Sequence, residues 1–154
     1  MNVLEAIQAR RSCREFSSEH ISREDVISIT ETGLQIPTAG RQQPLGIYFT
    51  MGPLTISRLS EAANQLWIES APCVFVILAD FPKIEKKYRT RGRQYALLEA
   101  GHAAQNICLA ATELGLGSCC VGAFRESKVL AALGLKRDCG LTPVYMVAVG
   151  KPKP

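Results

Sequence analysis

Five residues near the start of the chain, Arg10 to Arg14, carry three guanidinium groups and one hydroxyl. A guanidinium fork donates parallel hydrogen bonds to the oxygens of a phosphate. About one helix later comes a turn of small residues, 37–44, which is closed at each end by proline. Its glycine and alanine backbone would let a flat ring approach closely. Together the two segments indicate a site for a phosphorylated aromatic cofactor.

The basic residues also have simpler interpretations. Cations at a helix end compensate the helix dipole and are usually solvated. The strongest basic run, from Lys83 to Arg93, holds six cations opposed only by Glu85. We expect this run to form an exposed loop, with steering of an anionic cofactor or a nicotinamide phosphate as the alternative. The net charge of +4 is too small to indicate nucleic acid as a partner.

Length and composition indicate a single domain over residues 1–154. Hydrophobic residues make up 47% of the chain and charged residues 21%, as in a globular domain. No apolar run reaches the ~20 residues of a membrane span, and the first residues lack the apolar core of a signal peptide. We therefore expect no association with a membrane.

The six cysteines form no CxxC pair, and most of them lie inside apolar segments. This usage favours reduced thiols in a cytoplasmic protein and no metal site. Redox activity at the adjacent Cys119 and Cys120 is an alternative, since a strand of small apolar residues has the same appearance.

Hydrophobic periodicity predicts a mixture of helices and strands. Helices are expected over residues 2–11, 22–34, 54–65, 95–114 and 125–133. Strands are expected over residues 45–51, 73–79, 118–121 and 144–149. Helices and strands do not alternate one for one, and the fingerprints of dinucleotide-binding and P-loop folds do not occur. The expected fold class is α+β, a small sheet packed by helices.

Three of these elements have features that place them in the fold. The 73–79 segment is apolar throughout, so both of its faces should be buried. The 95–114 helix is apolar nearly all round, so it should be central, with a length of about 30 Å. The second helix begins with Ser22 as its cap, and Asp25 takes the reciprocal position of a capping box.

Two further pairs of residues are candidates for a site or for the core. Glu99 and His102 are three apart on the central helix, and we expect a buried hydrogen-bonded pair, within the chain or across a dimer, because a metal site would need more ligands. Trp67 and Tyr95 have the flat faces that could stack near a flavin. A lone aromatic beside apolar residues is more often part of the core.

Four motifs occur in order over almost the whole chain. They are Arg10 to Phe16, the turn 37–44, the run 99–124 and the closing segment 143–150. On these motifs the sequence resembles the FMN-dependent nitroreductase family, and most closely its azoline-oxidising dehydrogenase branch. The resemblance implies a nitroreductase-like α+β fold with a small mixed or antiparallel sheet, a long central helix and an intertwined homodimer. Two FMN sites would lie at the interface, each built from both chains.

The resemblance also assigns candidate cofactor-binding residues. The arginine segment would hold the phosphate and ribityl chain, with Lys151 or Lys153 adding to the phosphate site. The 37–41 turn would come from the partner subunit and line the flavin, and Gln65 would meet the pyrimidine edge. A backbone N–H near Gly122 would face the reactive ring nitrogen. The full set is Arg10, Arg11, Ser12, Arg14, Pro37, Thr38, Ala39, Gly40, Arg41, Gln65, Val121, Gly122, Ala123 and Lys151.

Two departures from the family pattern affect these expectations. Arg41 stands where many relatives carry asparagine. Many relatives also continue past the final strand with an arm that wraps the partner, whereas this sequence stops at Pro154. The interface is therefore expected to rest mainly on the long helix, with an open active site.

The implied activity is reduction of a small-molecule electron acceptor, a nitroaromatic or a quinone, by NAD(P)H in a ping-pong scheme. The flavin would carry the chemistry, so no side chain is assigned a catalytic role. One alternative is oxidation of an azoline-like ring, which removes a proton and needs a base such as Lys86, Lys87 or Tyr88. Another is a non-catalytic flavin-binding dimer.

Overall fold

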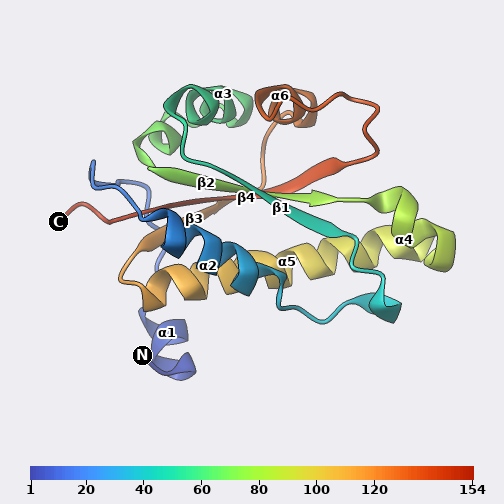
Figure 1. Cartoon of the computed structure of the whole chain (residues 1–154), viewed down its shortest axis with the longest axis horizontal. Coiled ribbons are helices and arrows are strands. Elements are labelled where there is room, and N and C mark those ends of the chain that lie inside the picture. The colour runs from blue at the N-terminus through green and yellow to red at the C-terminus, as the bar shows by residue number, and fades with distance from the viewer.

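A four-stranded antiparallel sheet separates two layers of helices (Figure 1). The computed structural model describes all residues, 1–154. The strand order is β1-β2-β4-β3, so the last strand of the chain lies inside the sheet. The strands are β1 Leu45–Thr50, β2 Cys73–Ala79, β3 Gly117–Val121 and β4 Thr142–Gly150.

The helices divide between the two faces of the sheet. One face carries α3, α6 and the short 3-10 turn η2, and the other carries α2 and the long α5 (Figure 1). The helices are α1 Val3–Ala9, α2 Arg23–Leu34, α3 Pro53–Ala63, α4 Phe81–Tyr88, α5 Thr90–Glu113 and α6 Glu126–Ala132, with 3-10 turns η1 Ala39–Arg41 and η2 Leu66–Ser70. The predicted α+β class with a small sheet is confirmed.

All seven residues of β2 are buried, as the apolar 73–79 segment predicts. The strand has a neighbour on each edge and a helical layer on each face. Because side chains alternate along a strand, Phe75 and Ile77 enter the core beneath α5, and Val76 enters the core beneath α3. The strand thus joins the two cores of the domain.

The long helix α5 crosses the whole sheet and is central, as predicted (Figure 1). Its 24 residues span about 36 Å. The residues that face the sheet are mostly small, and Ala100, Ala103 and Ala104 are buried there. Alanine side chains let the helix lie close against the strands.

The prediction of an exposed loop over 83–93 was wrong. These residues form most of α4 and the first turn of α5. The Asp80 side chain accepts the Lys83 N–H at 2.9 Å and so caps α4. Phe81 and Ile84 are buried on one face while the lysines stay exposed. The run is thus an amphipathic helix whose apolar positions are few.

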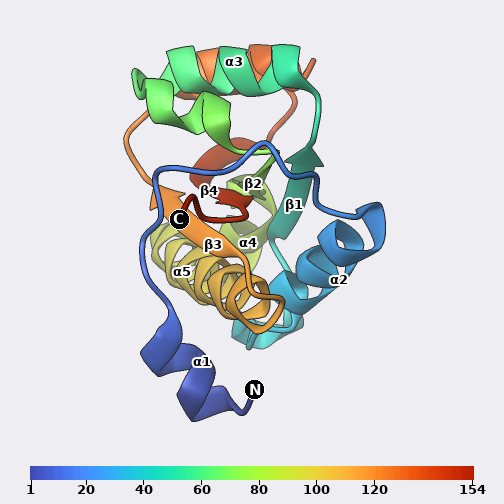
Figure 2. The same ribbon diagram turned by 90° about the vertical axis from the view of Figure 1, so that its left-hand side faces the viewer.

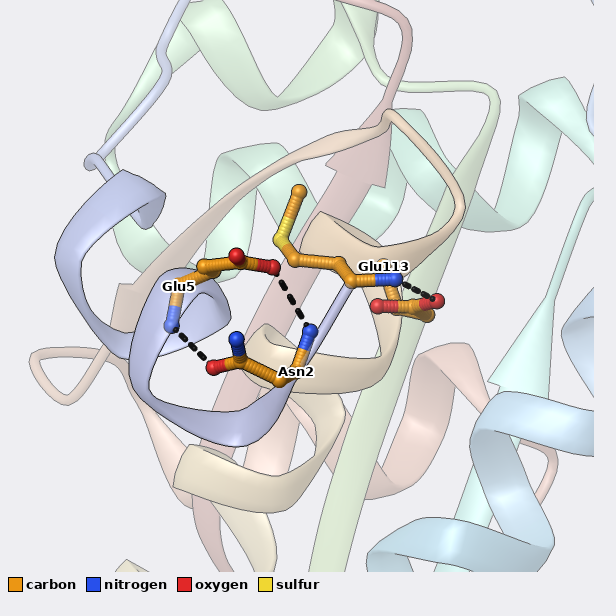
Figure 3. A network of polar contacts seen from close by, with 4 residues as sticks. Asn2, Glu5 and Glu113 are labelled. Carbon is orange, nitrogen blue, oxygen red and sulfur yellow. Dashed lines mark hydrogen bonds and ion pairs between the residues drawn. The ribbon is translucent and has the colours of Figure 1, made fainter.

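The first helix, α1, stands away from the body of the molecule (Figure 2). Asn2 and Glu5 form both bonds of a capping box, and the N-terminal ammonium pairs with Glu113 of α5 at 2.8 Å (Figure 3). Val3 and Leu4 are each 70% exposed. An anchored helix with an uncovered apolar side offers a surface for another chain.

The remaining element predictions are confirmed within a few residues. Ser22 caps α2 by accepting the Asp25 N–H at 3.0 Å, as predicted. The Asp25 carboxylate accepts from the Ser22 hydroxyl at 2.7 Å and not from the Ser22 backbone N–H, so the reciprocal bond of the expected capping box is not formed. The first helix ends earlier than expected, at Ala9, and α5 begins five residues before 95. None of the helices is long and apolar enough to cross a bilayer.

Candidate functional site

The arginine segment, residues 10–16, lies between the start of β3 and the end of the chain. Ser12 forms an isolated parallel bridge with Ser118, and Phe16 forms an antiparallel bridge with Pro152. The Phe16 ring is buried, which fixes the far end of the segment. The backbone of the segment is thus held on both sides while its charged side chains face outward.

The three guanidinium groups have different surroundings. Arg11 donates to the carbonyls of Gln8 and Arg10, so it caps the C-terminal end of α1. Arg10 and Arg14 form no ion pair, because the two ion pairs of the chain involve other cations. Two unpaired guanidinium groups beside the hydroxyl of Ser12 form a site that favours an anion.

Residues of η2 contribute to the same region. The Arg14 guanidinium lies 5.9 Å from the centre of the Trp67 ring, within reach of a cation–π interaction. The Trp67 N–H donates to the Gln65 side chain at 2.8 Å. The structure therefore brings Gln65 near the arginine segment, although 50 positions separate them in sequence. Trp67 packs on the core with one side and meets Arg14 as well.

The basic end of the chain also reaches this region. The Lys153 N–H donates to the Glu15 carbonyl at 3.0 Å. The Lys151 ammonium pairs with Glu19 at 2.6 Å, so part of its charge is already compensated. A role for Lys151 at a phosphate stays a prediction, and Lys153 is the cation of this pair that has no carboxylate neighbour.

Thiols of β3 lie directly behind the arginine segment. Burial raises the pKa of Cys119, and the positive charge of Arg14 opposes that rise. On the opposite face of β3 the sulfur of Cys120 lies 3.6 Å from that of Cys108 in α5. The hydrogen bond with Cys120 lowers the pKa of Cys108 to about 7. Burial alone raises the pKa of Cys73 to about 12.

These surroundings predict the order in which thiols react. A thiol reagent such as DTNB should modify Cys139 first, because that side chain is exposed, and Cys73 last. Cys73 is buried and, with its pKa near 12, protonated at neutral pH. The Cys139→Ser variant should lose the fast phase of absorbance at constant protein concentration. Fast labelling of Cys73 in native protein, read by peptide mass spectrometry, would contradict this order.

The small-residue turn follows α2 and forms η1. Gly40 has φ 54° and Arg41 has φ 58°, both in the left-handed region. The Lys87 ammonium of α4 donates to the Gly40 carbonyl at 3.3 Å, and Lys83 donates to the Gln43 carbonyl at 3.1 Å. The basic helix α4 therefore lies directly against this turn. We name residues 37–41 the platform.

The Glu99 side chain of α5 contacts the platform. One of its carboxylate oxygens accepts the Ala39 N–H at 2.7 Å. The other oxygen, Oε2, is buried and has no hydrogen-bond partner. The expected pair of Glu99 and His102 does not form within one chain, because Glu99 takes a backbone donor and His102 is exposed. A pair across a dimer stays a prediction. Both residues line one cavity of about 290 Å³ together with Pro37, Thr38, Ala39, Tyr95 and Leu98.

The third predicted part of the site lies at the end of β3. Gly122 is exposed and lines a separate cavity of about 230 Å³. A Cβ at this position would come within 3.3 Å of the Tyr145 ring. β3 connects Ser118 at the arginine segment with Gly122, about 13 Å away at the usual rise of a strand. Val121 is buried and turns into the core, so only Gly122 and Ala123 present backbone to solvent.

The arginine segment and the platform lie far apart within one chain. Met1, beside α1, contacts Glu113 near the end of α5, whereas Ala39 contacts Glu99. Fourteen residues of helix separate the two contacts, a distance of about 21 Å along the axis. Figure 1 shows α1 and η1 near opposite ends of the long axis of the molecule. Within one chain the two groups therefore lie at separate places.

Comparison with known proteins places this arrangement in a family. The Nitroreductase family model matches residues 7–70 and 53–151. A protein of Methanocaldococcus jannaschii, named as a candidate nitroreductase, is 30% identical and aligns with 92% of this chain and 87% of its own length. The FMN reductase (NADPH) of Bacillus subtilis is 26% identical over 98% of this chain, which spans 66% of that relative's length.

Solved structures agree with the sequence comparison. A nitroreductase family protein from Clostridium difficile superposes with a TM-score of 0.86 at 26% identity, covering 100% of this chain and 86% of the other. NfrA2 of B. megaterium also has a TM-score of 0.86 and 26% identity, with 68% of its length covered. The chain belongs to the nitroreductase family.

Some residues of the site were not identified from the sequence. Ser118 is buried beside Ser12 with a hydroxyl that has no partner. Lys87 and Tyr88 were considered only as possible bases of a loop, yet both lie against the platform. Pairing across β3 and packing of α4 on η1 bring them there, and neither leaves a local pattern in the sequence.

Proposed function

We propose that this protein is an FMN-dependent NAD(P)H oxidoreductase that reduces nitroaromatics or quinones. The observation that carries the proposal is the pair of unpaired guanidinium groups, Arg10 and Arg14, beside the Ser12 hydroxyl. Membership of the nitroreductase family supports the same cofactor, since relatives are named FMN reductase and NADPH-flavin oxidoreductase.

The residues present fit FMN. Its phosphate needs cations and hydroxyl donors, which Arg10, Arg14 and Ser12 supply. Its ring system needs a flat, half-apolar surface with close backbone approach, and the platform cavity of about 290 Å³ has that character. When bound, FMN supplies hydride acceptance from a nicotinamide and electron donation to the second substrate.

The side chains of this chain serve to bind and orient. Arg10 and Arg14 neutralise the phosphate, and Trp67 holds Arg14 through its ring. The Gly122 N–H lies at an exposed turn, where a donor can reach a ring nitrogen. No acid–base side chain is required for hydride transfer, so an alternating, ping-pong use of one open cavity is consistent with these surroundings.

A homodimer completes each site in this proposal. The platform of one subunit covers the ring whose phosphate is held by the arginine segment of the other. The exposed apolar residues of the chain supply the surface for such an association. They include Val3, Leu4, Ile7, Leu34, Leu97, Leu98 and Leu114.

One observation favours a second candidate, oxidation of an azoline-like ring. That reaction needs a base, and Lys87 and Tyr88 lie against Gly40 of the platform. NADPH consumption separates the two candidates. The first predicts flavin-dependent oxidation of NADPH with menadione or a nitroaromatic, and the second predicts none.

The visible spectrum of the purified protein tests the cofactor. After addition of FMN and removal of excess, we expect a bound flavin band that bleaches with NADPH and returns with menadione. Protein that takes up no FMN would contradict the proposal. FMN uptake without bleaching by NADH or NADPH would shift the assignment to the second candidate.

A further inference from the structure

The platform is a strained turn that has little support of its own. Arg41, which is not a glycine, has φ 58°, and such backbone persists only where surrounding contacts determine it. Its internal bonds join neighbouring residues, as from the Arg41 N–H to the Thr38 carbonyl at 3.3 Å. The lysine contacts from α4 are exposed. A stable platform therefore needs a buried hydrogen bond to a rigid element.

Glu99 provides that hydrogen bond. It is 4% exposed, it sits in the rigid middle of α5, and it accepts the Ala39 N–H at 2.7 Å across 60 positions of sequence. A charged acceptor makes a stronger hydrogen bond than a neutral one. No other buried side chain bonds to the platform backbone.

Hollow space beside the platform increases the importance of this bond. One cavity of about 260 Å³ is lined by Leu34, Ile36, Thr38, Gln43, Leu45 and Glu99. A second cavity, of about 290 Å³, contains Tyr95 and His102. Packing within the chain alone does not hold a turn that borders two hollows.

The free-energy cost of burying the Glu99 carboxylate indicates a role beyond packing. Glu99 Oε2 is buried without a partner, and a buried polar atom left unsatisfied is unfavourable for folding. We propose that Glu99 is a positioning residue that holds the platform in the shape required by the flavin ring. This inference rests on the proposed function.

Binding of two flavins to Glu99→Leu and Glu99→Gln tests the proposal. Leucine keeps the size but removes the acceptor, so affinity for both FMN and riboflavin should fall by about tenfold. Equal losses are expected because both flavins present the same ring to the platform. Glutamine keeps an oxygen for the Ala39 N–H and should restore both affinities to within about threefold of the unsubstituted protein. Thermal unfolding should show both variants folded.

Glu61→Ala is the control, because Glu61 is an exposed glutamate of α3, on the opposite face of the sheet from α5. It should bind both flavins normally. Unchanged flavin affinity in folded Glu99→Leu would overturn the proposal, and so would a loss confined to FMN. If leucine prevents folding, hydrogen exchange at the Ala39 amide of the unsubstituted protein tests the proposal. Slow exchange supports the hydrogen bond between Ala39 and Glu99, and fast exchange overturns it. An unsubstituted protein that binds no FMN contradicts the proposed function instead.

Discussion

An equimolar mixture of two variants that each retain little FMN through gel filtration, Arg14→Ala and Ala39→Trp, should regain about one quarter of the sites of the unsubstituted protein. The first variant loses the phosphate site, and the second fills the platform cavity with an indole. After subunit exchange about half the dimers are mixed. In each mixed dimer one site combines the intact arginine segment of one chain with the intact platform of the other.

The expected recovery follows from the separation of the two groups within one chain. FMN retained after gel filtration, measured by absorbance, gives the number of sites. Each variant alone, taken through the same exchange, provides the control. If both groups served a site within one chain, mixing would restore nothing. That outcome would contradict the shared site while leaving the phosphate role of Arg14 intact.

Arg14→Ala alone should weaken FMN binding by about 10- to 100-fold, the range expected for a lost charge-assisted hydrogen bond. Riboflavin, which has no phosphate, should bind with unchanged affinity. Arg14 is exposed, so its removal should not alter folding. Fluorescence titration with each flavin measures the two affinities, and the unsubstituted protein should lose FMN affinity as salt rises.

Arg58→Ala is a suitable control for this substitution. Arg58 is an exposed arginine within α3 and is not among the candidate cofactor-binding residues. It should bind FMN and riboflavin normally. If Arg14→Ala weakened riboflavin as strongly as FMN, the guanidinium would act on the ring and not on the phosphate. Unchanged FMN affinity would move the phosphate site away from Arg14.

Much of the fold could be predicted from the sequence because the local signals were strong. The unbroken apolar run at 73–79 coincides with β2, and the Ser22 cap marks the start of α2. The basic run at 83–93 was misread because charge density dominated its composition. The small buried cluster contains only Ala79, Phe81, Ile84 and Ala96, and of these Ile84 alone lies within the run. The capping Asp80 also lies outside the run.

The site was less predictable, because it depends on contacts between distant segments. Local composition predicted a phosphate site at the arginine segment and a ring site at the platform. It did not show that Glu99 would bond to Ala39 and leave His102 exposed. Helical spacing restricts which residues share a face, but the turn that meets that face is fixed by tertiary packing. The assignment of Gln65 remains a prediction, now with a plausible neighbour in Trp67.

The position of β4 inside the sheet has a consequence for biosynthesis. β2 pairs with β1, which precedes it closely, and with β4, which begins 63 residues after β2 ends at Ala79. During translation one edge of β2, the most apolar strand of the chain, therefore remains unpaired until residues 142–150 leave the ribosome. Open edges of this kind are prone to aggregate. Expression yield should thus depend on chaperone supply more strongly than the stability of the finished fold would indicate.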